Sequence, residues 1–293
     1  MSAQPPAAGR LPFGVRLAAA MDAHGPLCVG IDPHAALLDA WGLPDTPAGL
    51  RDFSLRVVEA LAGRVAAVKP QSAFFERHGS AGIAVLEEVL AALRRAGTPA
   101  ILDVKRGDIG STMAGYAQAY LADGAPLAAD AITVSPYLGY GSLTPALQAA
   151  AATGRGVFVL ALTSNPEGAA VQHARTASGR AVAAEVVAGA AASNAAARAA
   201  GELGSVGLVV GATVGDAVRE LDLDLLAAGG PLLAPGVGAQ GAGAPELQAV
   251  FGPARAHVLA SSSRGVLGAG PDPVQLRRAA ARAAAEAAAA LRA

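Results

Sequence analysis

The sequence is poor in several residue types, and each scarcity limits what the protein can be. Cys28 is the only cysteine among 293 residues, which excludes an intrachain disulfide and a cysteine-based zinc cluster and favours a reducing, cytoplasmic location. The formal net charge is −1, from 22 basic and 23 acidic residues. Because a nucleic-acid-binding domain normally carries a basic excess, we expect no nucleic-acid partner.

Long apolar segments are also missing. Outside alanine-heavy stretches, no apolar run reaches about 18 residues without a charged residue, a glycine or a proline. The N-terminal stretch is interrupted by Pro12, Gly14 and Asp22. We therefore expect neither a signal peptide nor a membrane span.

Lysine is nearly absent. Lys69 and Lys105 are the only two lysines, whereas the other 20 basic residues are arginine. A guanidinium group is a planar fork that does not give up its proton, whereas an ammonium is a compact charge. The two lysines are thus expected where chemistry requires an ammonium, and chance in an arginine-biased composition is the alternative.

The chain does contain short β-rich apolar runs that alternate with longer helical stretches. The expected strands cover residues 27–31, 65–69, 100–104, 130–134, 156–162, 206–210, 231–234 and 256–260. The expected helices cover residues 48–62, 80–96, 111–123, 142–153, 168–201, 214–220, 244–250 and 273–292.

This alternation predicts an α/β fold with a parallel sheet covered by helices. Eight strand–helix units favour a (β/α)8 TIM barrel, and an open doubly wound sheet is the competing architecture. Such a barrel fits the length of the chain, so we expect one domain over residues 1–293. Residues 1–10 and 285–293 are candidate flexible tails.

The densest group of polar residues is ILDVKRGDIGST, residues 101–112, at the end of the third expected strand. Active sites of these barrels lie at the carboxyl ends of the strands. Asp103 and Lys105 are two residues apart and so point to the same side, and Asp108 follows in a glycine-containing loop. The alternatives are a surface ion-pair cluster or a metal site, although an ammonium between two carboxylates competes with a metal ion.

A second group is LLAPGVGAQG, residues 232–241, which contains G-x-G-x-x-G. It lies too late in the chain for a dinucleotide fingerprint, and no acidic residue ends a following strand, so NAD is rejected. The glycine-rich backbone, Gln240 and the later Arg264 can bind an anion, and the loops after strands seven and eight often bind phosphate in these barrels. Turn glycines with a surface arginine are the alternative.

A third group is LALTSNPEG, residues 160–168, in which Thr163, Ser164 and Asn165 follow the fifth strand. These residues fit either a ligand contact or a helix N-cap. No catalytic triad is indicated. Solvated or packing roles are expected for all five histidines, namely His24, His34, His78, His173 and His257.

The order of these motifs resembles the orotidine 5′-phosphate decarboxylase family, in particular its longer bacterial subfamily. The resemblance runs from Gly30 to Gly265 and includes D-x-K-R-G-D-I-G-S-T, S-P-Y-L-G and T-S-N-P. It implies a homodimeric TIM barrel with shared active sites that converts orotidine 5′-monophosphate to UMP and CO₂. It also implies that neither a metal nor an organic cofactor takes part.

The resemblance implies a catalytic network of four residues. Lys105 matches the proton donor and Asp103 its carboxylate neighbour. Lys69 matches the lysine beside the ribose, and Asp108 matches an aspartate that reaches across the dimer into the partner's site.

Five further residues match substrate contacts by position. Asp32 and Thr112 match residues at the ribose, Thr112 from across the dimer. Ser164 matches the serine at the pyrimidine, and Gln240 and Arg264 match residues at the phosphate.

Two other functions stay open from the sequence. A metal-dependent sugar-phosphate decarboxylase or aldolase of a related barrel would need further acids at neighbouring strand ends, where Ser135, Ser164 and Thr213 stand. A phosphate-ligand sensor would bind without turnover, which the intact charged set within residues 103–108 disfavours.

Overall fold

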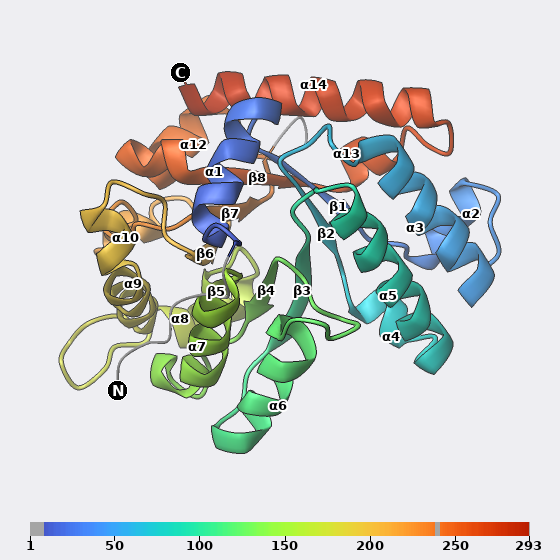
Figure 1. The fold of residues 1–293 in the computed structure, drawn as a ribbon. Coiled ribbons are helices and arrows are strands. Elements are labelled where there is room, and N and C mark those ends of the chain that lie inside the picture. The colour runs from blue at the N-terminus through green and yellow to red at the C-terminus, as the bar shows by residue number, and fades with distance from the viewer. Residues whose placement is uncertain (1–8, 238–240, 293) are drawn as a thin grey trace.

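The structure is a computed structural model that describes residues 9–237 and 241–292. Within this part of the chain, eight strands form one sheet at the centre of the molecule (Figure 1). The strands are β1 (Leu27–Ile31), β2 (Ala67–Pro70), β3 (Ile101–Arg106), β4 (Ala131–Val134), β5 (Gly156–Leu162), β6 (Val206–Val210), β7 (Leu232–Pro235) and β8 (Val258–Ser262). Each lies within two residues of the bounds expected from the sequence.

Neighbouring strands pair in parallel, in the order β2-β1-β8-β7-β6-β5-β4-β3. The two end strands, β2 and β3, are joined by the isolated bridges Val68–Ala100 and Gln71–Asp103, which nearly close the ring. We call this junction the β2–β3 seam. The predicted TIM barrel is confirmed, and its strands are almost wholly apolar because helices cover one face and side chains fill the other.

The helices surround the barrel (Figure 1). They are α1 (Phe13–His24), α2 (Ala35–Ala40), α3 (Pro47–Leu61), α4 (Ala73–Glu76), α5 (Gly79–Arg95), α6 (Gly110–Leu121), α7 (Thr144–Thr153), α8 (Ala169–Gln172), α9 (Val182–Ser193), α10 (Ala195–Ala199), α11 (Ala217–Glu220), α12 (Ala244–Phe251), α13 (Arg264–Leu267) and α14 (Pro273–Arg292), with 3₁₀ turns η1 (Tyr140–Leu143), η2 (Pro166–Gly168) and η3 (Gly252–His257).

Helix α1 closes the amino-terminal end of the barrel, and the sequence analysis missed it. Its Phe13 packs edge-to-face on Phe158 of β5, with ring centroids 5.9 Å apart. A Cβ atom at Gly156 would lie 2.2 Å from the Phe13 ring, so this contact requires glycine. Pro12 and Gly14 were interpreted as breaks, whereas Pro12 is the N-cap and Gly14 is buried against a neighbouring loop.

The single helix expected over residues 168–201 is wrong. The segment forms α8, α9 and α10, with an irregular loop between α8 and α9. Gly179 turns this loop with a φ of 82°, which favours glycine. Asn194 separates α9 from α10, and its buried amide binds the Val206 and Ala228 carbonyls. These are tertiary contacts, which an alanine-rich local pattern does not reveal.

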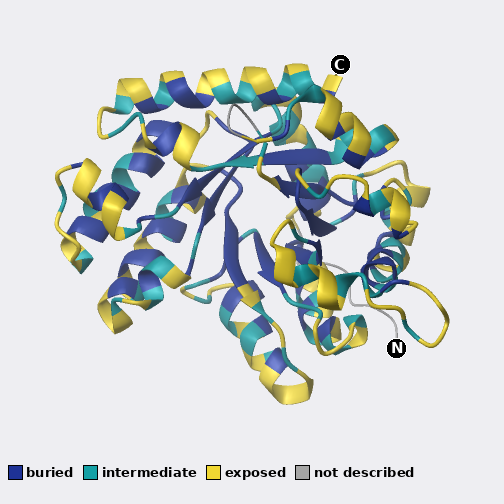
Figure 2. Cartoon of the chain, turned by 180° about the vertical axis from the view of Figure 1, so that it is seen from behind, coloured by how far each residue is buried: buried dark blue, intermediate teal, exposed yellow. Residues whose placement is uncertain are grey.

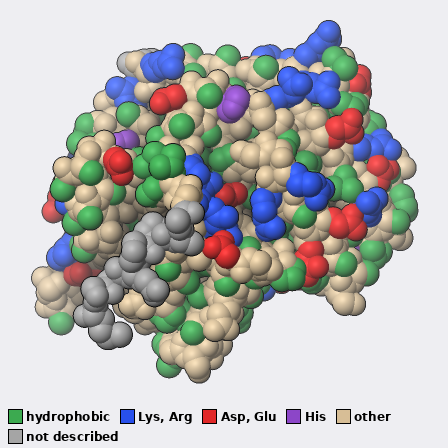
Figure 3. All heavy atoms as spheres, in the orientation of Figure 1, with side chains coloured by type: hydrophobic (Ala, Val, Ile, Leu, Met, Phe, Trp, Pro, Cys, Tyr) green, Lys and Arg blue, Asp and Glu red, His purple; other side chains and the backbone are tan. Residues whose placement is uncertain are grey.

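The strands and the inner faces of the helices are buried, and the outer helix faces are exposed (Figure 2). Residues 285–292, a candidate flexible tail, form the last turns of α14, where Leu291 is buried. On the face shown in Figure 3, acidic and basic side chains are interspersed. No helix in the described part of the chain is long and apolar enough to cross a membrane.

Candidate active site

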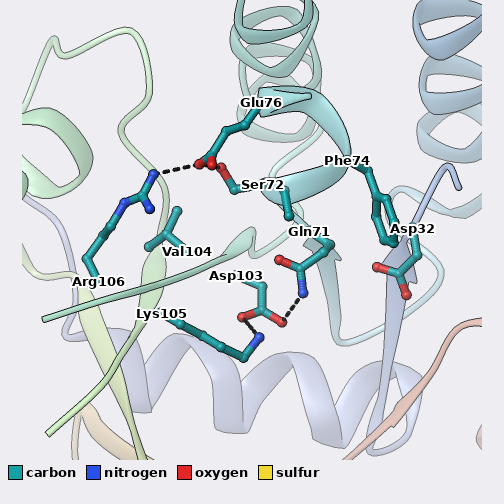
Figure 4. Close-up of a pocket in the computed structure, with 10 residues that line it drawn as sticks. Asp32, Gln71, Ser72, Phe74, Glu76, Asp103, Val104, Lys105 and Arg106 are labelled. Atoms are coloured by element: carbon teal, nitrogen blue, oxygen red, sulfur yellow. Dashed lines mark hydrogen bonds and ion pairs between the residues drawn. The ribbon is translucent and has the colours of Figure 1, made fainter. Parts of the chain in front are cut away.

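Asp103 of β3 is the centre of an ionic network at the carboxyl ends of the strands. Its Oδ2 accepts hydrogen bonds from Lys69 Nζ at 2.7 Å and Gln71 Nε2 at 3.1 Å. Its Oδ1 accepts hydrogen bonds from Lys105 Nζ at 2.6 Å and Thr133 Oγ1 at 2.7 Å. Figure 4 shows the carboxylate between Lys105 and Gln71. Four donors therefore fix the orientation of this one carboxylate.

The inner ion pair is charged although it is buried. Lys69 and Asp103 are only 8% and 6% exposed. Burial alone would raise the pKa of Asp103, but the charges of Lys69 and Lys105 outweigh it and lower this pKa from 3.8 to about 2. Burial likewise opposes the charge on Lys69, yet Asp103 and Asp32 raise the pKa of its ammonium above 10.5. Both groups therefore carry charge across the neutral pH range.

The pKa of Asp103 predicts an acid-sensitive contribution to stability. Its folded pKa of about 2 lies below the reference value of 3.8, so the stabilisation is present above that reference value and is lost as the pH falls through the folded value. The difference corresponds to about 2 kcal/mol. We expect urea unfolding to show this extra loss between about pH 5 and pH 2 in the wild type but not in a Lys69→Met/Asp103→Asn double variant, which removes both buried charges and leaves only the half-exposed Lys105 ammonium, which water can solvate.

The two proteins differ only at Lys69 and Asp103, so the difference between the two pH curves reports on the ionisation of Asp103 within the network. Parallel curves would contradict an Asp103 carboxylate whose pKa is lowered by Lys69 and Lys105.

Lys105 differs from Lys69 in its access to solvent. Its side chain is 47% exposed, whereas that of Lys69 is 10% exposed. Its backbone has a φ of 44°, in the left-handed region that side-chain-bearing residues rarely adopt. The exposed ammonium lines a cavity of about 410 Å³ together with Gln71, Phe74 and Asp32 (Figure 4). Lys105 is therefore the cation of the network that a ligand can reach.

Asp32 follows β1 and contributes an acceptor to the same cavity. Its Oδ1 is buried and has no hydrogen-bond partner among the described residues. A Cβ atom at Gly30 would lie 2.0 Å from Ser263 Oγ and 2.8 Å from Asp32 Oδ2, so glycine allows β1 and the loop after β8 to approach closely. Asp32 can thus accept a hydrogen bond from a ligand hydroxyl.

A larger cavity of about 1590 Å³ shares Asp32, Asp103 and Lys105 with the first and extends across the barrel mouth. Part of its wall belongs to α14, so this volume exceeds that of the mouth alone. On the far side it is lined by Gly236 and Arg264, the expected anion site. Within residues 9–237 and 241–292, the Arg264 guanidinium makes no hydrogen bond or ion pair.

Part of the predicted anion site cannot be compared with the structure, because Gln240 lies outside the described residues. The neighbouring backbone is compact. Gly236 has a φ of 91°, and a Cβ atom at Gly241 would lie 1.9 Å from the Gly236 carbonyl oxygen. Glycine is therefore required at both positions for the turn after β7.

Three predicted site residues make no contact with the ionic network of their own chain in the part that the structure describes. Asp108 Oδ1 accepts a hydrogen bond from the backbone N–H of Ile109, and no ion pair links Asp108 to Lys105 in the described part of the chain. Thr112 is exposed in the first turn of α6. Ser164 is exposed in the loop after β5, where its neighbour Thr163 lines the larger cavity.

The sequence analysis missed Gln71 and Thr133, which complete the donors around Asp103. Gln71 stands two residues after Lys69, and this spacing could have placed it on the same side as the lysine. Thr133 is the one hydroxyl in an apolar strand, where a β-branched residue needs no special explanation. Its function is visible only once β3 and β4 are paired.

A second polar cluster surrounds the small cavity. Glu76 of α4 accepts hydrogen bonds from Ser72 Oγ and from Arg106 at 2.6 Å each (Figure 4). The Arg106 guanidinium also lies over the Tyr116 ring, 5.6 Å from its centroid. The Glu76–Arg106 pair therefore connects the segment after β2 to the end of β3. No group of three or more His, Cys, Asp or Glu side chains within residues 9–237 and 241–292 is arranged to hold a metal ion.

Comparisons with known proteins agree with this geometry. Residues 25–280 match the model of the orotidine 5′-phosphate decarboxylase / HUMPS family. The chain is 61% identical over 279 residues to orotidine 5′-phosphate decarboxylase of Salinispora tropica, covering 95% of this chain and 98% of the relative. It is 59% identical to the enzyme of that name from Streptomyces coelicolor, covering 94% and 96%.

Solved structures of similar proteins share the fold. A Streptomyces avermitilis protein superimposes with a TM-score of 0.91 at 57% identity, covering 100% of this chain and 99% of that one. The OMP decarboxylase of Leishmania donovani has a TM-score of 0.74 at 33% identity, covering 97% and 100%. Because the family model matches most of the chain and the curated relatives cover nearly all of it, the protein belongs to the orotidine 5′-phosphate decarboxylase / HUMPS family.

Proposed function

We propose that this site decarboxylates orotidine 5′-monophosphate to UMP and CO₂, the last step of de novo UMP synthesis, with Lys105 as the proton donor. The observation that carries this proposal is the exposed Lys105 ammonium, held 2.6 Å from Asp103 at the cavity. Curated relatives at 57–61% identity carry the name of this activity, including those from Salinispora and Streptomyces.

The chemistry explains why a fixed cation is needed. Loss of CO₂ from C6 of the pyrimidine leaves an electron pair in the plane of the ring, where the ring π-system cannot delocalise it. A preorganised ammonium stabilises this charge as it develops. Lys105 Nζ then donates a proton to C6, which forms the C–H bond of UMP and leaves a neutral amine.

Asp103 keeps the proton donor in place. Its Oδ1 binds the Lys105 ammonium, while its Oδ2 is held by Lys69 and Gln71. Because the low pKa keeps this carboxylate ionised, the ammonium remains anchored throughout the neutral pH range. The proposed reaction uses neither a metal ion nor an organic cofactor, and turnover should persist in EDTA, unlike that of a metal-dependent sugar-phosphate enzyme.

The substrate phosphate is assigned to the opposite side of the barrel mouth. Arg264 can donate two hydrogen bonds to a phosphate, and a glycine-rich loop such as the one after β7 can offer it backbone N–H groups. Gln240 is proposed as a further donor, and Ser164 as a contact to the pyrimidine. Binding energy from the phosphate can hold the reacting ring against Lys105, although the two groups are far apart.

The assay that tests this function follows the loss of orotate-ring absorbance when the enzyme meets its substrate. Arg264→Ala is expected to lower kcat/KM for orotidine 5′-monophosphate by about 10- to 100-fold, because a charge-assisted phosphate contact is lost. For orotidine, which has no phosphate, kcat/KM should change by less than about threefold. Equal losses for both substrates would make Arg264 a structural residue, and binding without turnover by the wild type would favour the sensor function.

We also propose a homodimer with shared active sites, located in the cytoplasm. Ile109, Tyr137 and Leu138 are 61%, 77% and 52% exposed in the loops after β3 and β4, an apolar surface suited to a second copy of the chain. Asp108 immediately precedes Ile109 in the chain, and Thr112 follows in the first turn of α6. Among the described residues, neither side chain contacts the ionic network of its own chain. Both observations support contributions of Asp108 and Thr112 to the partner's ribose site.

A further inference from the structure

Thr133 of β4 occupies an unusual position beside the ionic network. It is 1% exposed and lies between apolar neighbours, Ile132 and Val134. Its hydroxyl donates to Asp103 Oδ1 at 2.7 Å and accepts the backbone N–H of Lys105 at 3.0 Å. One hydroxyl is thus bonded both to the backbone of Lys105 and to the carboxylate that holds the Lys105 ammonium.

The backbone of β3 explains why Lys105 needs this contact. Leu102 pairs with Ile132, but the next pair is Arg106 with Val134, so β3 contains a bulge between them. Lys105 lies within the bulge and has a φ of 44°. Its N–H has left the strand ladder and is satisfied by the Thr133 hydroxyl instead. Such a strained conformation persists only where its surroundings hold it.

We infer that Thr133 is a positioning residue, which fixes the proton donor Lys105 by holding its strained backbone and the Asp103 oxygen that binds its ammonium. This inference rests on the proposed function. The polarity of the contacts is determined, because the hydroxyl has one hydrogen and the Lys105 N–H can only donate. The hydroxyl of Thr133 therefore donates its hydrogen bond to Asp103, whose carboxylate is ionised.

Gln71 is a weaker candidate for the same positioning role. It donates to the other oxygen of Asp103 at 3.1 Å, but no hydrogen bond connects it to Lys105 in the described part of the chain. Removing the hydroxyl of Thr133 is the change that releases both the carboxylate oxygen and the Lys105 backbone. A displacement of about 1 Å at a reacting group is enough to lower turnover by about 100-fold.

The experiment compares Thr133→Val, which keeps the shape but removes the hydroxyl, with Thr133→Ser, which keeps the hydroxyl. We expect kcat to fall by about 10- to 100-fold in Thr133→Val, with KM changed by less than about threefold. Thr133→Ser should remain within about threefold of the wild-type kcat. Thr133→Ala replaces the valine variant if that protein does not fold.

Thr98→Val is the matched control. Thr98 is also buried, at 3% exposure, and accepts a hydrogen bond from the Gly63 N–H at 2.8 Å, at the opposite end of β3. Its loss removes a comparable buried contact, so stability should fall while kcat stays within about twofold of the wild type. A wild-type kcat in Thr133→Val, or an equal loss in Thr133→Ser, would overturn the inference.

A second readout does not depend on turnover. Because the chain has only two lysines, ¹³C-lysine labelling gives one ε-methylene NMR signal for each, and Lys105→Arg assigns them. Thr133→Val should shift the Lys105 signal, whereas Thr98→Val should shift neither. An unmoved Lys105 signal would overturn the inference. If the wild type did not decarboxylate its proposed substrate, the proposed function would fail. The NMR comparison would still show whether Thr133 positions Lys105, because it does not require turnover.

Discussion

Lys105→Ala should lower the turnover of orotidine 5′-monophosphate by at least about 10⁴-fold, because it removes both the cation beside C6 and the proton that C6 receives. Proton transfer from a positioned group contributes about 10²- to 10⁴-fold, and one preorganised charge contributes about 10²- to 10³-fold. The side chain is half exposed, so its loss leaves little buried space to fill. Thermal unfolding and UMP binding should therefore stay close to those of the wild type.

Lys105→Arg should be almost as inactive. A guanidinium restores the charge but does not readily give up a proton. Arg51→Ala is the matched control, since it removes an exposed cation that pairs with Glu88 far from the site and should leave turnover unchanged. More than about a tenth of wild-type turnover in either Lys105 variant would exclude Lys105 as the proton donor.

Chains carrying Lys105→Ala and chains carrying Asp108→Asn should restore activity when they are mixed. If Asp108 serves the partner's site, each mixed dimer has one site with both residues intact and one site with both residues changed. Unfolding and co-refolding at equal concentrations makes about half of the dimers mixed, so about a quarter of all sites should be active. The turnover of the mixture should therefore exceed that of the Lys105→Ala chain alone by more than about 10³-fold.

Mass spectrometry of the intact dimers establishes that mixed dimers have formed. A mixture of two Lys105→Ala preparations, refolded in the same way, is the control for refolding itself. If mixed dimers are present and activity does not exceed the sum of the separate variants, Asp108 acts within its own chain and the shared-site proposal is wrong.

The sequence was sufficient to predict the barrel because its strands are buried on both faces. A run such as GVFVLAL over residues 156–162 is apolar throughout, and it alternates with helical segments at a regular spacing. The failures were helices defined by distant contacts. Helix α1 depends on Phe158, and the break between α9 and α10 depends on the buried amide of Asn194.

The site was predictable to the extent that charge and strand position determine it. Asp103 and Lys105 are two residues apart on β3. Lys69 lies in β2 and Asp32 follows β1, and these strands end on the same side of the barrel. Thr133 was not predictable, because its partners come from β3 and its residue type is common in strands. The assignments of Asp108 and Thr112 depend on a second chain, which no single-chain pattern can place.

The β2–β3 seam links the stability of the barrel to its chemistry. In place of a continuous backbone ladder, the seam has two isolated bridges and the side-chain contacts of Lys69 and Gln71 with Asp103. Lys69, Gln71 and Asp103 therefore both position the proposed proton donor and close the barrel. A substitution at one of these residues is expected to change turnover and stability together. Directed evolution for heat tolerance has more freedom at the amino-terminal end, where α1 seals the barrel far from Lys105.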